Sequence, residues 1–464
     1  MLPGAAFNNK DSHMADVAAG PSERSMRRVA LTSLAGTSIE WFDFFLYGTA
    51  AALIFPAVFF SPDMPPLVSL IASFSTFAVG FLARPIGGII FGHFGDRVGR
   101  KAALVTALVM MGVATTLIGC LPTYGMIGGA APLLLVILRF VQGLAVGGQW
   151  GGAMLLVTEN APDGKRGFYG AFAQAGAPVG LILANLAFLI VSESVSQEAF
   201  MTWAWRIPFI CSIALIGLSL YVQLRLEDTP AFRELQALSK TAAADSSVAQ
   251  IVERRSPVLE ALSRYPKQIA LAAGAFLAVQ VTFYIMVTFV IAYGSNPAGL
   301  GLPRSTMLAA VLISSVAQIP ALFIAAAYSD KHGRRGVYML GAVLLGIWGF
   351  FLFPLIDSGS FLLITFAVCV GQILIGMMYG PQAAMLAELF TTEVRYSGAS
   401  LGYQSGAILG GALAPIIATG LLAVYGSTIG ISVYIAIACG LTLLSVYLLS
   451  ETHQTDLRAA PIKS

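Results

Sequence analysis

Apolar residues fill long stretches of this chain, in place of the short periodic patterns of a soluble protein. A helix that crosses a bilayer needs about 20 apolar residues. Twelve stretches meet this need, at 28–60, 66–94, 102–121, 131–158, 167–192, 203–224, 267–294, 305–329, 337–356, 360–387, 396–424 and 428–450. The pattern therefore predicts an all-α integral membrane protein with twelve transmembrane helices.

The longest polar connection lies between the sixth and seventh stretches and predicts the domain organisation. It divides the chain into six-helix bundles at 28–224 and 267–450, joined by a linker at 225–266. Polar tails are expected at 1–27 and 451–464. Two bundles of six helices are typical of transporters that move one bundle against the other.

Basic residues are distributed unevenly between the two sides of the predicted bilayer. Most of the 26 lie in the two tails, the linker and the loops on the same side, whereas the opposite loops contain Arg304. Basic residues mark the cytoplasmic side of membrane proteins. Both termini are therefore expected in the cytoplasm, in a multi-pass protein of the cell membrane.

Composition agrees with this prediction and narrows the possible functions. Hydrophobic residues make up 57% of the chain and charged residues 11%, and the mean hydropathy is +0.81. A soluble domain has about 25% charged residues, so soluble enzymes and nucleic-acid-binding proteins are excluded. The cysteines occur singly and the histidines lie outside the apolar stretches, which predicts no metal site and no cofactor. The sequence lacks a glycine-rich ATP-binding loop, so a gradient should supply the energy.

Charged motifs recur at equivalent positions of the two halves. "GHFGDRVGRK" (92–101) ends the second predicted helix, and "AAYSDKHGRR" (326–335) ends the eighth. The spacing of Glu159 and Arg166 recurs in Glu388 and Arg395, and Gln174, Gly176 and Gly180 recur as Gln404, Gly406 and Gly410. Repeats with the same charges at the same loops predict transporter architecture.

These motifs resemble the major facilitator superfamily. Its pattern G-x-x-x-D-R/K-x-G-R/K-R/K is matched by Gly92, Asp96, Arg97, Gly99, Arg100 and Lys101, and the second copy departs from it at Ala326. The resemblance implies a gate that closes the cytoplasmic side while the outer side is open. Its members would be the residues of the first motif together with Glu159, Arg166, Asp330, Arg334, Arg335, Glu388 and Arg395.

A narrower resemblance covers most of the first half. "EWFDFFLYG", "FLARPIGGIIFGHFGDRVGRKAAL", "RFVQGLAVGGQWGGA", "WAWRIPF" and "EDTPAF" resemble the metabolite:proton symporter family. This family includes transporters of shikimate, 2-oxoglutarate, citrate, and proline or betaine, and the shikimate transporters are the most similar. The family usually has Glu where this chain has Gln149, so any role of that glutamate is lost or altered here.

Four ionisable residues fall inside the predicted spans: Glu40, Asp43, Arg84 and Arg139. Such a charge costs about 2.5–3.5 kcal/mol to insert, so it indicates function by default. Glu40, Asp43 and Tyr47 share one face of the first helix, and Arg84 is expected at a similar depth as a partner for either acid. We expect Glu40 and Asp43 to carry protons. Arg84, with Arg139, would hold a carboxylate; the alternative is that the charges only pair to hold helices together.

Neutral side chains complete the predicted site: Tyr47, Gln149, Trp150, Gln174, Gln280 and Gln404. The sequence predicts a monomeric proton-coupled symporter that imports a small carboxylate metabolite, such as shikimate or a di- or tricarboxylate, by alternating access. Its partners would be this substrate, protons and the lipid bilayer. The alternatives are a proton-coupled exporter of organic compounds and a symporter of zwitterions such as proline or betaine. A sensor without flux and a membrane enzyme fit the sequence less well.

Overall fold

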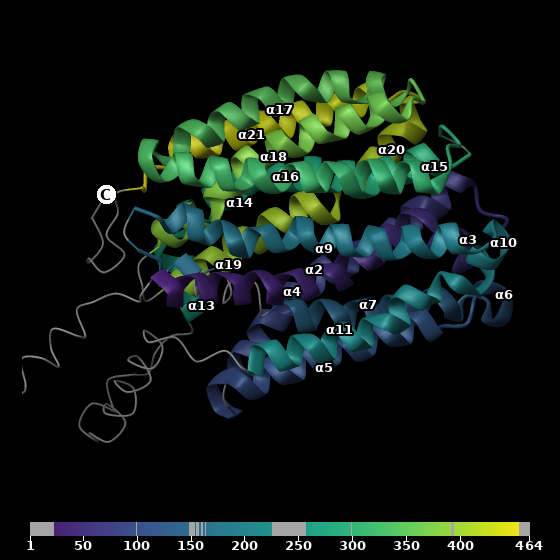
Figure 1. Ribbon diagram of the computed structural model, residues 1–464, viewed down its shortest axis with the longest axis horizontal. Coiled ribbons are helices and arrows are strands. Elements are labelled where there is room, and N and C mark those ends of the chain that lie inside the picture. The colour runs from purple at the N-terminus through teal and green to yellow at the C-terminus, as the bar shows by residue number, and fades with distance from the viewer. Residues whose placement is uncertain are drawn as a thin grey trace, which may run out of the picture.

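The computed structural model describes residues 23–98, 100–147, 154, 157–158, 161–162, 164–224, 257–297, 299–390 and 394–453. Within these ranges every regular element is helical. Figure 1 shows the helices running roughly side by side along the long axis of the molecule. In the same view α16, α17, α18 and α21 gather along one edge, and α5, α7 and α11 along the other.

The first half contains nine α-helical elements and one π-helical turn among the described residues. They are α2 (Glu23–Leu53), α3 (Phe55–Val58), α4 (Pro66–Val98), α5 (Arg100–Cys120), α6 (Tyr124–Ile127), α7 (Ala130–Val146), α9 (Arg166–Ser194), α10 (Gln197–Ala199), η1 (Phe200–Ala204) and α11 (Arg206–Leu224). The pair α10 and η1 meets α11 at a bend of 51°.

The second half begins with a short helix in the region predicted as a linker. Its elements are α13 (Pro257–Arg264), α14 (Pro266–Tyr284), η2 (Ile285–Phe289), α15 (Val290–Ser295), α16 (Arg304–His332), α17 (Arg334–Ile356), α18 (Phe361–Leu389), α19 (Arg395–Gly406), η3 (Ala407–Ala412), α20 (Ala414–Tyr425) and α21 (Ile429–Leu448). The π-helical turns η2 and η3 interrupt two of the spans, and such turns frequently mark functional sites.

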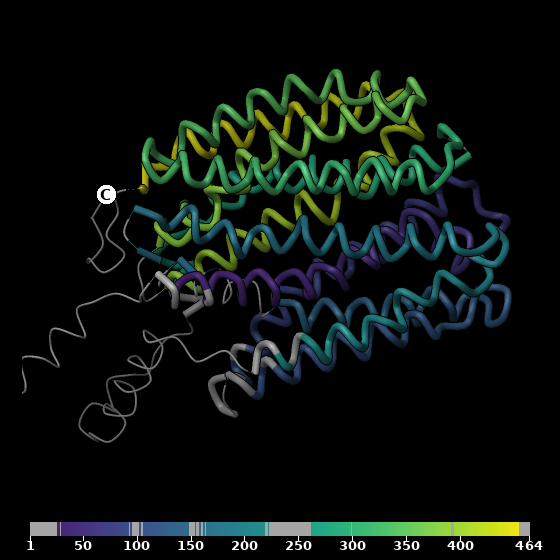
Figure 2. Tube along the Cα trace, in the orientation of Figure 1, coloured from purple at the N-terminus to yellow at the C-terminus, as the bar shows by residue number. Residues whose placement is uncertain are grey.

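Eight helices of the described chain are long and apolar enough to cross a membrane. The bent pair at 197–218 and the shorter apolar helices Val105–Cys120 and Ala130–Val146 supply further spans. Together with α2, whose apolar run contains Glu40 and Asp43, these helices fill the twelve predicted positions. Figure 2 shows the start of α2 and the end of α21 at the same end of the molecule, as expected for two cytoplasmic termini.

Glycines allow helices of each half to pack closely at equivalent places. A Cβ on Gly176 would lie 2.0 Å from Thr37 Oγ1, so α9 approaches α2 where only glycine fits. In the second half, a Cβ on Gly406 would lie 2.6 Å from Phe276 Cβ, so α19 also approaches α14 closely. Small residues let membrane helices approach in this way. The repeated glycines of the sequence thus perform the same packing task in both halves.

Candidate transport site

A small cavity lies where the two halves meet, at about the middle of α2. It is lined by Glu40, Trp41, Phe44, Arg84, Val146, Tyr403 and Gln404. These side chains come from α2, α4 and α7 of the first half and from α19 of the second. The cavity measures about 10 Å³, which is close to the least space that holds one water molecule. A metabolite would fit here only if the helices moved apart.

Arg84 is the basic residue of this cavity. Only 2% of it is exposed, and its guanidinium carbon lies 4.3 Å from the ring centre of Phe44 and 4.7 Å from that of Phe81. Glu40 is the acid whose charge acts on it, and Tyr403 interacts with both Arg84 and Gln280. Nε and Nη2 of Arg84 have no hydrogen-bond partner among the described residues. This edge of the guanidinium can bind both oxygens of a carboxylate.

Asp43 belongs to a second polar group, away from the cavity. Its Oδ2 accepts a hydrogen bond from Thr115 Oγ1 at 3.2 Å, and Thr115 Oγ1 accepts one from Gln142 Nε2 at 2.8 Å. Arg139 Nη1 donates to Gln142 Oε1. All four side chains are buried. The sequence left Arg84 as a partner for either acid, and in the structure Arg84 acts on Glu40 whereas Arg139 acts on Asp43.

Close packing of α4 on α7 fixes both arginines. A Cβ on Gly80 would lie 2.4 Å from Arg139 Nε, and one on Gly147 would lie 2.0 Å from the carbonyl oxygen of Arg84. The Arg139 side chain therefore needs the space that Gly80 leaves open. Arg139 also lies against Tyr47, with 4.1 Å between its guanidinium carbon and the ring centre. Tyr47 in turn donates to Thr76 Oγ1 at 2.8 Å.

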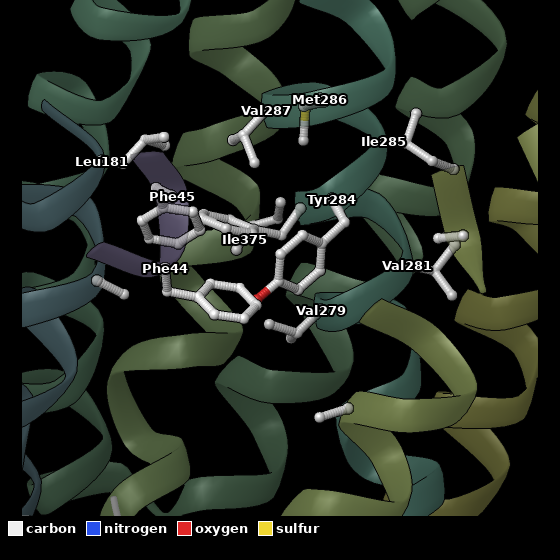
Figure 3. Packing of buried hydrophobic residues seen from close by; sticks show 14 of the residues in the cluster. Phe44, Phe45, Leu181, Val279, Val281, Tyr284, Ile285, Met286, Val287 and Ile375 are labelled. Atoms are coloured by element: carbon white, nitrogen blue, oxygen red, sulfur yellow. The ribbon is translucent and has the colours of Figure 1, made fainter. Parts of the chain in front are cut away.

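Aromatic rings close the space between the halves beside the cavity. Figure 3 shows Phe44 and Phe45 facing Tyr284 of α14, at ring-centre distances of 6.2 and 6.4 Å. Tyr284 also lies 5.3 Å from Phe81, and a Cβ on Gly411 would touch both of these rings. Phe44 contacts the guanidinium groups of Arg84 and Arg139. Any separation of the halves at this level must move these rings.

The predicted cytoplasmic gate contains a contact between the two halves. Asp330 at the end of α16 accepts hydrogen bonds from the backbone N–H groups of Gly167 and Phe168, both at 2.8 Å. It therefore caps the start of α9, where a carboxylate is stabilised by the unpaired N–H groups and the helix dipole. Arg334 contacts Asp330 at 2.6 Å and Glu388 at 3.1 Å. Within the described residues, Asp330 thus joins α16 of the second half to the start of α9 in the first.

The residues after α21 extend this gate, which the sequence analysis did not foresee. Glu451 accepts hydrogen bonds from the backbone N–H groups of Arg334 and Arg335 at 2.8 and 3.0 Å, and so caps α17. Thr452 donates to Glu388 Oε2 at 2.7 Å. Partial burial acts to raise the pKa of Glu451, but the backbone donors outweigh it, and the pKa lies below its usual value.

Other predicted site residues lie away from the cavity, and some fall outside the residues that the structure describes. Gln174 Nε2 donates to the carbonyl oxygen of Tyr379 at 3.3 Å, which links α9 to α18. Arg166 begins α9, and Arg395 Nε donates to the carbonyl oxygen of Phe390 at 3.2 Å. Gly99, Gln149, Trp150 and Glu159 lie outside the described residues, and the description of Gly92, Asp96, Arg97, Arg100 and Lys101 stops at the helix backbone.

Several residues of the site were missed by sequence reasoning, and some had a signal. Phe44 follows Glu40 by one helical turn, so the spacing that grouped the acids also places this ring on the cavity. Gln142 follows Arg139 by a similar step within "RFVQG". Thr115 had no such signal, since a threonine in an apolar helix usually bonds its own backbone. Among the described side chains, no three His, Cys, Asp or Glu residues gather as metal ligands.

Comparisons with known proteins agree with this architecture. The family described as sugar (and other) transporter matches residues 29–461. The chain belongs to this family. It is therefore a membrane transporter, as the sequence predicted, and its fold is that of the major facilitator superfamily. This transporter is 42% identical over 436 residues to the inner membrane metabolite transport protein YhjE of Escherichia coli strain K12, with 93% of this chain and 96% of the relative covered.

Two further likenesses bear on the site. The shikimate transporter of Escherichia coli strain K12 is 38% identical over 430 residues, covering 92% of this transporter and 95% of the relative. Among solved structures, a D-xylose–proton symporter superposes with a TM-score of 0.71 at 17% identity, covering 92% of this chain and 99% of that one. At this identity the likeness supports the fold alone.

Proposed function

We propose that this transporter is a proton-coupled symporter that imports a small carboxylate metabolite by alternating access. The observation that carries the proposal is the unpaired edge of Arg84, buried in a cavity between the two halves. A buried cation with free donors is costly unless a ligand completes it. A planar carboxylate matches the Nε and Nη2 donors of that edge.

The acids beside the arginines would carry the coupled proton. Asp43 is fully buried, and its Oδ1 has no hydrogen-bond partner in the described part of the chain. Glu40 lines the cavity beside Arg84, so an incoming carboxylate would compete with it for the same cation. A proton on one or both acids would remove negative charge as the substrate arrives, because an apolar interior disfavours unpaired charge. Substrate and proton would thus favour the same state.

The relatives and the neutral groups of the cavity guide the choice of substrate. Gln404 lines the cavity with its Oε1 free of partners among the described residues, and Tyr403 lies beside it. Such groups suit hydroxyls of a substrate whose carboxylate binds Arg84. The 38% identical shikimate transporter makes shikimate and related hydroxylated acids the first compounds to test, ahead of di- and tricarboxylates.

A zwitterionic substrate is the second candidate, and one observation favours it. The cavity contains Glu40 as well as Arg84, and a zwitterion presents one charge for each. The proline/betaine transporter of Escherichia coli strain K12 is 31% identical over 436 residues, covering 94% of this chain and 85% of the relative. In this case the Glu40 carboxylate would stay charged and contact the substrate's ammonium group.

Uptake into proteoliposomes tests both candidates in one experiment. Purified transporter would be given an inward proton gradient and a panel of labelled hydroxylated acids, dicarboxylates, proline and betaine. We expect accumulation of a carboxylate above equilibrium, abolished by a protonophore. Accumulation of proline or betaine alone would favour the second candidate. Transport that runs only outward against the gradient, or without any response to it, would overturn the proposal of proton-coupled uptake.

A further inference from the structure

Thr115 occupies the middle of a chain of side chains that joins Asp43 to Arg139. These hydrogen-bonded side chains belong to three helices. Asp43 lies on α2, Thr115 on α5, and Gln142 and Arg139 on α7. All three hydrogen bonds run in the same direction, from Arg139 towards Asp43. Arg139 donates to Gln142, Gln142 donates to Thr115, and Thr115 donates to Asp43. All four residues are at most 1% exposed. In an interior of low dielectric such a run of aligned bonds is strengthened.

The Thr115 hydroxyl has two acceptors within reach. Its Oγ1 lies 3.2 Å from Asp43 Oδ2 and 2.9 Å from the backbone carbonyl oxygen of Met111. A hydroxyl has one hydrogen and two acceptor lone pairs, so it can donate to only one of these oxygens at a time. With Asp43 ionised, donation to the carboxylate completes the chain. With Asp43 protonated, the carboxyl O–H can donate to Oγ1, and the hydroxyl hydrogen can turn to Met111.

We infer that Thr115 is a positioning residue that transmits the protonation state of Asp43 to Arg139 through Gln142. The inference rests on the proposed proton-coupled function and deepens it. When Asp43 takes a proton, the last hydrogen bond reverses and the run of donors ends at Thr115. Gln142 then bonds to a hydroxyl that no longer faces a charge, and Arg139 loses its anionic counterpart. The Nε and Nη2 atoms of Arg139 are unpaired among the described residues. They are then the donors available to bind another anion.

Few charged groups lie around Asp43, so a change in its protonation can be attributed to a small set of residues. Arg139 on α7 is the charged group that acts on it, while Arg84 on α4 and Tyr284 on α14 act on Arg139. Glu40 and Tyr47 lie one turn away on α2 itself. The neighbouring helices α9 and α11 bring no charged group to Asp43 within the described residues. A change at Thr115 should therefore alter the proton dependence of transport through Asp43.

The test compares Thr115→Val with Thr116→Val in proteoliposomes. Thr116 is the next residue, and its hydroxyl has no partner among the described residues, so its substitution is a matched control. For Thr115→Val we expect the pH midpoint of uptake to rise by about one unit, because the ionised form of Asp43 loses a donor. Gradient-driven accumulation should fall about tenfold, while substrate exchange at equal pH is retained. Thr115→Ser should restore both properties, and Thr116→Val should behave as wild type.

Two further variants keep the inference falsifiable. In the Asp43→Asn background, Thr115→Val should cause no additional change, since the two residues act as one unit. Gln142→Leu should reduce gradient-driven accumulation without abolishing exchange, and it serves if Thr115→Val does not fold. A wild-type pH profile in both Thr115→Val and Gln142→Leu overturns the inference while proton coupling stands. Absence of gradient-driven uptake in the wild type itself overturns the proposed function instead.

Discussion

Three buried arginines lie in very different surroundings, and they divide between the gate and the transport site. Arg334 contacts Ser329, Asp330 and Glu388 through Nε and both terminal nitrogens. Arg84 and Arg139 each leave Nε and Nη2 without a partner among the described residues, and aromatic rings cover them. All three are at most 2% exposed, so burial alone does not separate them.

This difference in hydrogen-bond partners distinguishes a buried charge that stabilises the fold from one that is available to bind a ligand. A buried ion pair that satisfies its hydrogen bonds holds two elements in one arrangement, and removing one partner is costly. A buried cation with open donors is incomplete, and each such group calls for an explanation. Under the proposed function, Arg334 stabilises the contact between helices, and Arg84 and Arg139 have donors available for a ligand. This contrast between the gate and the site can be broken or sharpened by substitution.

The largest effect on stability is expected for Arg334→Ala in the gate. Its loss leaves Asp330 and Glu388 without their shared cation, which costs about 3–5 kcal/mol for a buried pair. We expect a clear fall in the unfolding temperature of the purified transporter in detergent. Arg335→Ala is the control, because that side chain donates to the carbonyl oxygens of Val446 and Tyr447 at the surface. Equal losses for the two variants would contradict the assignment.

The next largest effect concerns binding and belongs to Arg84. A charged hydrogen-bonded contact contributes about 1.5–3 kcal/mol, so Arg84→Ala should raise the KM for a carboxylate about 10- to 100-fold. Arg84→Lys keeps the charge but lacks the planar fork, and it should give an intermediate value. Uptake kinetics measure both variants, with the unfolding temperature as a check on folding. An unchanged KM in Arg84→Ala would mean that the open donors do not meet the substrate.

A smaller effect is expected for Gly80→Ala, which probes Arg139 without removing it. The new methyl carbon would lie 2.4 Å from Arg139 Nε, so the side chain must shift, at about 1–3 kcal/mol for such overpacking. Transport should fall while the fold survives. Gly217→Ala is the control, since nothing lies within 4 Å of a Cβ there. If both variants transport like the wild type, the position of Arg139 has no part in transport.

The smallest effect should come from Glu451, and it depends on pH. The pKa of this carboxyl is lowered in the folded protein because backbone donors favour its charged form. Its contribution is therefore present above the ordinary value near 4.5 and is lost as the pH falls through the lower folded value. Glu451→Gln should lower the unfolding temperature slightly at pH 7. The difference from wild type should shrink below about pH 4, and a constant difference would contradict the cap.

The sequence predicted the helices more completely than it predicted the arrangement of the site. Apolar length predicted the spans, and spacing alone picked out the glycines that pack α9 and α19. The spacing in the sequence also grouped Glu40 with Asp43, because both lie on one face of α2. It could not show that α4 and α7 bring their arginines to different acids, because Gly80 and Gly147 set that approach through three-dimensional packing. The hydrogen bonds that give Thr115 and Glu451 their roles join them to residues that are distant in the sequence, so no local pattern marks them.

Asp43→Asn tests the central claim most directly, because the amide keeps the shape of the side chain and removes its titration. Wild-type and variant proteoliposomes would be compared for accumulation of the substrate under an inward proton gradient and for exchange of substrate at equal pH. We predict that accumulation above equilibrium is lost while exchange continues. Accumulation at the wild-type level in Asp43→Asn would contradict the claim that this carboxyl couples proton movement to transport.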